Sequence, residues 1–158
     1  MGSSCLDCGA MVDGAHQFSL RIYYEDTDAG GVVYYANYLK FAERARTEML
    51  RLAGVPHERL RENTGASFAV SRCQVDYLRP AKLGDEIWVS TRLTSLCGAS
   101  AEMEQIVGRG DARLARVAIR LAFVSSEGKP TRLPPSLRNA LTPLLVSSEQ
   151  PHSAPRGG

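Results

Sequence analysis

The densest group of reactive side chains in this 158-residue sequence is the acidic cluster Glu25-Asp26-Thr27-Asp28. Gly30 and Gly31 follow it directly, and a segment with helical spacing begins near Asn37. A carboxylate beside the start of a helix is favoured in its charged form, and a charged carboxylate can attack a carbonyl carbon or accept a proton from water. The same residue types are also common in turns, where Asp26 and Asp28 would only accept hydrogen bonds from the backbone. The spacing leaves both interpretations open.

Other common catalytic sites lack their residues in this sequence. The histidines stand at positions 16, 57 and 152, and none lies in the strand–turn–helix context of a nucleophilic serine, so a Ser-His-Asp triad is not expected. No lysine follows Gly30 and Gly31 at the spacing of a phosphate-binding loop. No histidine or cysteine joins the acidic cluster in the sequence, which argues against a metal there.

The four cysteines form no complete metal or redox motif. Cys5-x-x-Cys8 is half of a zinc site, but no second pair follows at the required spacing. Cys73 and Cys97 lie in strand-like segments, where we expect them to be small buried apolar residues. We therefore expect neither a metal nor a redox cofactor.

Two patterns predict the elements on either side of the acidic cluster. Apolar and polar residues alternate over residues 18–24, which predicts a strand. From Asn37 the apolar residues recur every three or four positions and form one stripe, which predicts a long helix. Asn37 is the expected N-cap, and Gly54 followed by Pro56 ends the helix. The cluster therefore lies in the connection between a strand and the start of a helix.

The pattern in the second half of the sequence predicts consecutive strands. Alternation recurs over residues 68–77, 87–93, 99–107 and 115–123, and a slip in phase between Val70 and Cys73 predicts a β-bulge. The segment Gly108-Arg109-Gly110-Asp111 reads as a hairpin turn rather than an adhesion motif. Residues 134–145 are expected to form a short helix or an irregular cover. Short loops between the strands predict antiparallel neighbours.

These elements predict an α+β fold in which one antiparallel sheet packs on a single long helix. Such a sheet leaves an edge or a face uncovered, which favours pairing with a second copy of the chain. Residues 1–16 and 147–158 are rich in small and polar residues without periodicity. We therefore expect unstructured tails around one domain at residues 17–146.

The overall composition excludes several classes of protein. Hydrophobic residues make up 44% and charged residues 23%, as in ordinary globular domains. The net charge of +2 gives no reason to expect a nucleic-acid partner. No apolar run is long enough for a membrane span, and the N-terminus lacks the pattern of a secretory signal. We expect a cytoplasmic protein.

Two motifs carry a resemblance to a known family. Residues 24–38 read YEDTDAGGVVYYANY, which resembles the signature of the hotdog-fold acyl-CoA thioesterases. It is most similar to the branch that includes 4-hydroxybenzoyl-CoA thioesterase and the Tol-Pal-associated thioesterase, and residues 43–51, ERARTEMLR, are similar to the latter group. A second landmark, Val75-x-Tyr77-Leu78-x-Pro80-Ala81-x-x-Gly84-Asp85, falls where that family has a strand and a turn. The resemblance spans residues 18–138.

The resemblance implies a helix wrapped by an antiparallel sheet, a homodimer or homotetramer with its active site at a subunit interface, and hydrolysis of an acyl-CoA to CoA and a carboxylic acid. Asp28 matches the catalytic acidic residue, which acts as nucleophile or general base. Tyr35 matches the position whose backbone N–H binds the oxyanion, and Gly30 and Gly31 allow the substrate to approach the backbone. Tol-Pal-associated members often have histidine where this chain has Tyr35, whereas the 4-hydroxybenzoyl-CoA branch has tyrosine. A backbone amide is unaffected by that change.

Two other functions fit the same fold. Hotdog dehydratases and hydratases use a histidine with an acidic partner, and no histidine accompanies Asp28 in the sequence. A scaffold of the cell-envelope machinery that holds acyl-CoA or acyl carrier protein with little turnover stays open as the alternative. The phosphates of CoA suit arginine, and candidates on the later strands are Arg72, Arg116 and Arg120, which equally fit a solvated face.

Overall fold

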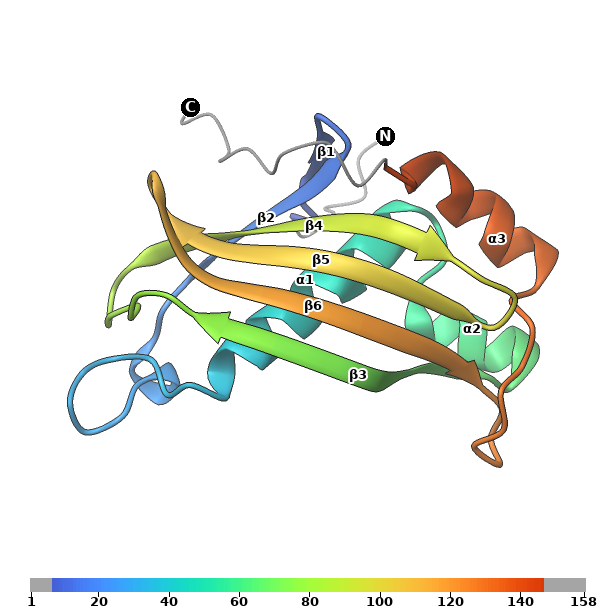
Figure 1. Cartoon of the computed structure of the whole chain (residues 1–158), viewed down its shortest axis with the longest axis horizontal. Coiled ribbons are helices and arrows are strands. Elements are labelled where there is room, and N and C mark those ends of the chain that lie inside the picture. The colour runs from blue at the N-terminus through green and yellow to red at the C-terminus, as the bar shows by residue number, and fades with distance from the viewer. Residues whose placement is uncertain (1–6, 147–158) are drawn as a thin grey trace.

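The structure is a computed structural model that describes residues 7–146. A single antiparallel sheet of six strands, in the order β1-β2-β4-β5-β6-β3, wraps one side of a long helix, as Figure 1 shows. The strands are β1 (Ala10–Val12), β2 (Ala15–Arg21), β3 (Ser67–Tyr77), β4 (Glu86–Leu96), β5 (Ser100–Arg109) and β6 (Ala112–Val124). The helices are η1 (Tyr24–Asp26), α1 (Asn37–Leu52), α2 (His57–Thr64), α3 (Pro135–Leu141) and η2 (Thr142–Leu144). The predicted α+β fold is confirmed.

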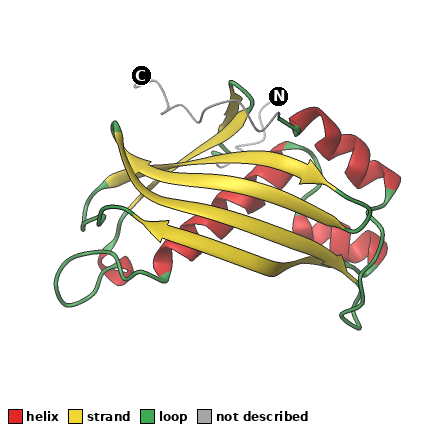
Figure 2. Ribbon diagram, in the orientation of Figure 1, coloured by secondary structure: helices red, strands yellow, loops and turns green. Residues whose placement is uncertain are grey.

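Helix α1 forms where the apolar stripe predicts it and lies against the inner face of the sheet (Figure 2). Its buried residues are spaced three and four apart, so they share one face of the helix. Ala36, not Asn37, occupies the N-cap position, so the predicted cap is wrong. Asn37 is the first helical residue, and its side-chain Nδ2 donates a hydrogen bond to the Asp26 carbonyl oxygen over 2.8 Å. Asn37 therefore ties the helix to the acidic cluster instead of capping its own helix.

The core lies between α1 and the sheet in two adjoining clusters. One cluster contains Phe123 and Met49 together with the apolar side of α3, and the other contains Phe41 and Val89. Strand β6 alternates cleanly between buried residues on this inner face and exposed residues such as Arg116 on the outer face. That alternation is what a sheet covered on one side requires.

The predicted pairing of consecutive strands is wrong at one place. Strand β3 pairs with β6, and β4 pairs with β2 and β5, so β5 and β6 separate β3 from β4 in the sheet. Their connection, residues 78–85, is longer than a tight hairpin turn and can cross the end of the sheet. The predicted β-bulge is confirmed by the shift in register between Val70 and Arg72. The turn at Gly110 joins β5 to β6 as a hairpin, as predicted.

The ordered sheet starts earlier than the predicted boundary at Gln17. Residues 10–16 form β1 and the start of β2, so the expectation of an unstructured tail is wrong for them. His16 is completely buried, and its Nε2 lies 2.6 Å from the Cys8 carbonyl oxygen. Burial lowers the pKa of His16 below its usual value. The expected tails at residues 1–6 and 147–158 lie outside the described residues.

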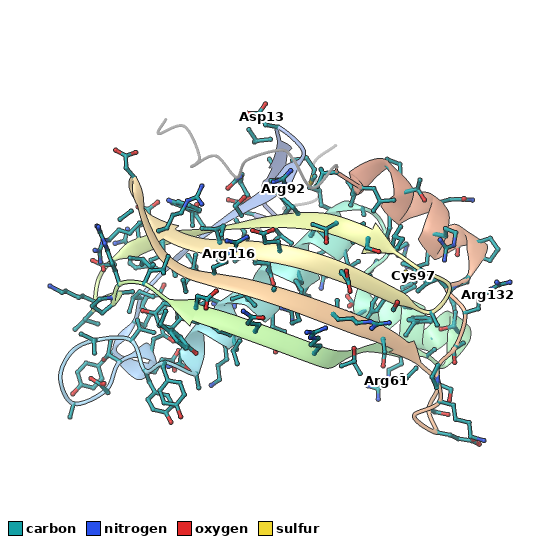
Figure 3. All side chains as sticks on the ribbon, in the orientation of Figure 1. Asp13, Arg61, Arg92, Cys97, Arg116 and Arg132 are labelled. Carbon is teal, nitrogen blue, oxygen red and sulfur yellow. The ribbon has the colours of Figure 1, made fainter. Side chains whose placement is uncertain are left out.

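Three further local predictions need correction. The polar stretch before Gly65 forms α2, which the sequence pattern did not show because Leu60 is its only buried residue. Cys73 and Cys97 are exposed rather than buried. Cys97 lies in the turn between β4 and β5 (Figure 3), and Cys73 faces the side of β3 that α1 leaves uncovered. Within residues 7–146, no helix has the length and apolar character needed to cross a membrane.

Candidate active site

The acidic cluster lies in a loop that folds back on itself between β2 and α1. The Asp28 backbone N–H donates to the Val32 carbonyl oxygen over 2.8 Å, and the Tyr34 N–H donates to the Asp26 carbonyl oxygen over 3.1 Å. Thr27 and Val33 pair between these two bonds as an isolated antiparallel bridge. The fold of the loop therefore brings the acidic residues beside the segment that leads into α1.

The two aspartates of this loop have different surroundings. Asp26 is half-buried, and its Oδ2 accepts a hydrogen bond from the Tyr23 backbone N–H over 2.8 Å, so Asp26 is a turn residue. Asp28 is exposed, and its Oδ1 accepts a bond from the Gly30 N–H over 2.8 Å. Within residues 7–146, Asp28 Oδ2 forms no hydrogen bond. One oxygen orients the carboxylate while the other is available for chemistry.

The glycines after Asp28 are required by the geometry of this turn. A Cβ atom on Gly30 would lie 3.2 Å from Asp28 Oδ1 and would press on the carboxylate. Gly31 has a φ of +78°, in the left-handed region that other residues adopt at a cost. Both positions therefore favour glycine for the shape of the loop, independently of any bound molecule.

The segment that leads into α1 presents backbone N–H groups beside the start of the helix. In the described part of the chain, the N–H of Tyr35 has no hydrogen-bond acceptor. The other end of the same residue is fixed, because the Tyr77 hydroxyl donates to the Tyr35 carbonyl oxygen over 2.9 Å. A free N–H at a helix N-terminus, where the helix dipole is positive, is suited to bind a negatively charged oxygen.

The side chains of Tyr34, Tyr35 and Tyr77 form an aromatic group beside the start of α1. The ring centroids of Tyr34 and Tyr35 lie 4.7 Å apart, and those of Tyr35 and Tyr77 lie 6.2 Å apart. The neighbouring phenol of Tyr35 raises the pKa of Tyr34. Tyr38 packs edge-on against Tyr77, with centroids 5.5 Å apart, and continues the group into the core.

Residues 78–85 support the loop from the other side. The Val33 N–H donates to the Ala81 carbonyl oxygen over 2.8 Å, and the Ala81 N–H donates to the Tyr38 hydroxyl over 2.9 Å. Asp85 then anchors this segment through the Lys82 N–H and the Arg109 guanidinium. Burial alone would raise the pKa of Asp85, but these two donors lower it below its usual value. The second sequence motif, residues 75–85, therefore holds the loop of the first motif, residues 24–38, in place.

The structure brings together some predicted residues and separates others. Asp28, Gly30, Gly31 and Tyr35 lie on one folded loop. The candidate CoA-binding arginines lie on the opposite, outer face of the sheet, where Arg116 pairs with Glu104 over 2.8 Å (Figure 3). The positions of Arg72 and Arg120 beside each other on that face favour the solvated-face interpretation. Sequence reasoning missed Tyr77 as part of the site, although it stands in the second landmark.

The described residues offer no evident metal site. Among residues 7–146, no group of three or more histidine, cysteine, aspartate or glutamate side chains could hold a metal ion. Cys8 is buried in the fold, and its partner in the Cys5-x-x-Cys8 motif lies outside the described residues. The chemistry available at the loop is that of a carboxylate and an oriented amide.

Comparison with known proteins finds similarity to thioesterases in both sequence and structure. The family model described as Thioesterase-like superfamily matches residues 23–141. An acyl-CoA thioesterase YbgC from Haemophilus influenzae is 40% identical over 131 residues, which cover 82% of this chain and 96% of that protein. An acyl-CoA thioester hydrolase YbgC from Escherichia coli is 41% identical over 123 residues, which cover 77% of this chain and 91% of that protein. The crystal structure of a probable thioesterase from Bartonella henselae superposes with a TM-score of 0.72 at 38% identity, covering 76% of this chain and 99% of that one.

Proposed function

The chain belongs to the thioesterase-like superfamily and is an acyl-CoA thioester hydrolase, and from that premise we propose that the Asp28 carboxylate and the Tyr35 backbone N–H perform its chemistry. The observation that supports this proposal is the presence of two groups without hydrogen-bond partners on one folded loop. Asp28 Oδ2 and the Tyr35 N–H have no hydrogen-bond partner in the described chain, while Asp28 Oδ1 and the Tyr35 carbonyl oxygen are each held by a hydrogen bond. Groups held ready in this way need little reorganisation during a reaction.

The proposed reaction uses the Tyr35 N–H to hold the thioester oxygen. As the carbonyl carbon becomes tetrahedral, its oxygen gains negative charge, which the N–H and the dipole of α1 stabilise. Asp28 acts in one of two ways. Its Oδ2 attacks the carbonyl carbon and expels CoA as a thiolate, after which water hydrolyses the mixed anhydride. Alternatively, Oδ2 takes a proton from a water that attacks directly. Both routes end in a carboxylic acid and CoA, which gains the proton.

We also propose that a second copy of the chain completes the molecule. Strand β3 pairs only with β6 in the described chain, so its outer edge has free backbone groups. Its inner-face residues Val70 and Tyr77 are 54% and 47% exposed because α1 does not cover them. Antiparallel pairing of two β3 edges would satisfy the backbone and cover these side chains.

Acyl carrier protein as an alternative carrier of the acyl group stays a prediction.

The direct test is thiol release from short-chain, long-chain and aromatic acyl-CoAs. We expect Asp28→Asn to lower turnover about 100-fold or more while acyl-CoA binding persists, because the amide keeps the shape of the loop. The matched control is Asp111→Asn, the same substitution at an exposed residue in the turn between β5 and β6. Equal turnover in wild type and Asp28→Asn would refute the proposed role. Absence of turnover on every substrate would favour the binding scaffold.

A further inference from the structure

A cavity of about 220 Å³ lies between α1, α2 and β3, beyond the loop described above. Its walls are mainly apolar, with Leu50, Phe68, Val70, Met103 and Leu121 on the sheet and helix sides. Three polar side chains also line it, namely Glu43, Arg46 and His57. An apolar cavity with a few polar groups is the usual form of a small-molecule site.

Arg46 is unusual among these residues because it is only 7% exposed and forms no ion pair within residues 7–146. Burial lowers the pKa of Arg46, but arginine stays charged at neutral pH. Glu43 supplies an opposite charge through space, without a direct ion pair. Burying an incompletely paired charge is costly, so we take its retention as a sign of a binding role. Arg46 Nη1 donates one hydrogen bond, to Gln105 Oε1 over 2.9 Å.

Gln105 fixes the direction of this arginine. Its Nε2 donates to the Ala42 carbonyl oxygen and to Thr91 Oγ1, each over 2.9 Å. The Ala42 carbonyl can only accept, so the amide nitrogen must face it and Oε1 must face Arg46. Gln105 is completely buried, and its three bonds hold it in one orientation. One end of the guanidinium is therefore fixed, and its remaining N–H donors have no hydrogen-bond partner within residues 7–146 on a side chain that lines the cavity.

Glu43 supplies the complementary group. It stands one helical turn before Arg46 and lines the same cavity, but it forms no ion pair with it in the described chain. Arginine only donates hydrogen bonds and an ionised glutamate only accepts them. A hydroxyl group, which both donates and accepts, can satisfy the two together. A carboxylate would bond to Arg46 but would be repelled by Glu43.

The inner face of β3 extends from the reaction site to the cavity. Tyr77 at one end of that face binds Tyr35, and Val70 near the other end lines the cavity. Cys73, between them, is also exposed. From Asn37, the start of α1, Glu43 and Arg46 lie roughly 9 and 14 Å along the helix axis. A medium-length acyl chain laid along this face would place its far end between the two charged groups.

Resting on the proposed function, we infer that Arg46 and Glu43 form a specificity site for a hydroxyl group at the far end of a medium-chain acyl group. Charge-assisted hydrogen bonds to a hydroxyl favour the hydroxylated chain roughly tenfold or more over the plain chain. A site that pairs with a hydroxyl also discriminates against chains that lack it, because the buried Arg46 then loses a partner. The substrate class is thus a terminally hydroxylated acyl-CoA.

The experiment measures binding of non-hydrolysable thioether analogues of medium-chain acyl-CoAs, plain, terminally hydroxylated or terminally carboxylated, by calorimetry. Wild type is expected to bind the hydroxylated analogue roughly tenfold more tightly than the plain one. In Arg46→Met this preference falls to near unity. The matched control is Arg44→Met, the same change at an exposed position of α1 outside the cavity. That control keeps the wild-type preference.

A second variant keeps the test decisive if Arg46→Met fails to fold. Glu43 is exposed, so Glu43→Leu preserves the fold and removes only the acceptor. It is expected to abolish the preference for the hydroxyl and to improve binding of the carboxylated analogue. A wild-type preference for the plain or carboxylated analogue overturns the inference, as does a preference for the hydroxyl that survives in Glu43→Leu. Binding of the analogues does not require Asp28 and therefore tests only the specificity site. The catalytic proposal is tested separately, by measuring thiol release in Asp28→Asn.

Discussion

Replacing Tyr77 by phenylalanine removes one hydroxyl and the 2.9 Å hydrogen bond that it donates to the Tyr35 carbonyl oxygen. The ring remains and keeps its edge-on contact with Tyr38. Partial burial and the neighbouring phenols raise the pKa of Tyr77, so the wild-type hydroxyl keeps its proton through the neutral range. The substitution therefore tests whether fixing Tyr35 matters for the proposed oxyanion donor.

The expected size of the effect follows from the strength of one hydrogen bond. A neutral intramolecular bond contributes about 0.5–1.5 kcal/mol, which corresponds to a rate effect of roughly two- to tenfold if the loss falls on the transition state. Complete loss of an oxyanion donor costs about 100- to 1,000-fold. Because Tyr77→Phe loosens the Tyr35 N–H without removing it, we expect kcat to fall roughly three- to tenfold.

The assay is steady-state thiol release, with kcat and KM measured separately, together with the melting temperature. We expect KM to change little, because substrate binding in the ground state does not depend on the developing charge. The matched control is Tyr24→Phe, since Tyr24 is 82% exposed and its hydroxyl forms no hydrogen bond within residues 7–146. A kcat for Tyr77→Phe equal to that of Tyr24→Phe would refute the positioning role, and a rise in KM alone would assign Tyr77 to substrate binding.

Three further predictions concern stability and assembly. Gly108→Ala would place a Cβ atom 2.1 Å from the Trp88 ring. We therefore expect its free energy of unfolding, measured in urea, to fall by about 2–3 kcal/mol. The control Gly98→Ala, whose Cβ atom would meet nothing within 4 Å, should have a much smaller effect. Asp85 has a lowered pKa in the folded state, so its carboxylate stabilises the protein at neutral pH, and this contribution disappears as the pH falls through that folded pKa. Asp85→Asn should therefore lose about 1 kcal/mol near pH 7 and show a weaker decline in acid, as measured by urea unfolding across pH; parallel curves for both proteins would contradict this. Val70→Glu places a charge on the uncovered inner face of β3 and should shift a dimer to monomer in light scattering, and an unchanged mass would argue against pairing through β3.

Much of the fold is visible in the order of residues because its signals are local. The apolar stripe of α1 and the alternation of β6 each arise from a repeat within one element, and both elements form where the repeat predicts them. The bulge near Val70 is also local, because a change in phase moves side chains to the other face. Helix α2 lacked such a signal, since one buried leucine leaves no stripe to detect.

The candidate site likewise contains residues with a local sequence signal and one residue without such a signal. Asp28, Gly30 and Tyr35 lie close together in the sequence, so one motif was enough to name them. The support from Tyr77 depends on a contact between residues 42 positions apart. Its role could not be predicted from spacing, because it requires knowing that the end of β3 lies beside the segment that leads into α1.

By itself, the sequence determined the types of the main elements, the loop that carries Asp28 and the family to which the chain is similar. Only the tertiary structure decided that β3 pairs with β6 rather than with β4, that β1 and His16 belong to the sheet, and that Gln105 binds the buried Arg46 at the wall of a cavity. The physical reason is the range of the interactions. Periodicity and turn chemistry act between near neighbours, whereas strand pairing and buried polar networks join residues that are distant in the chain and become specific only when the whole core packs.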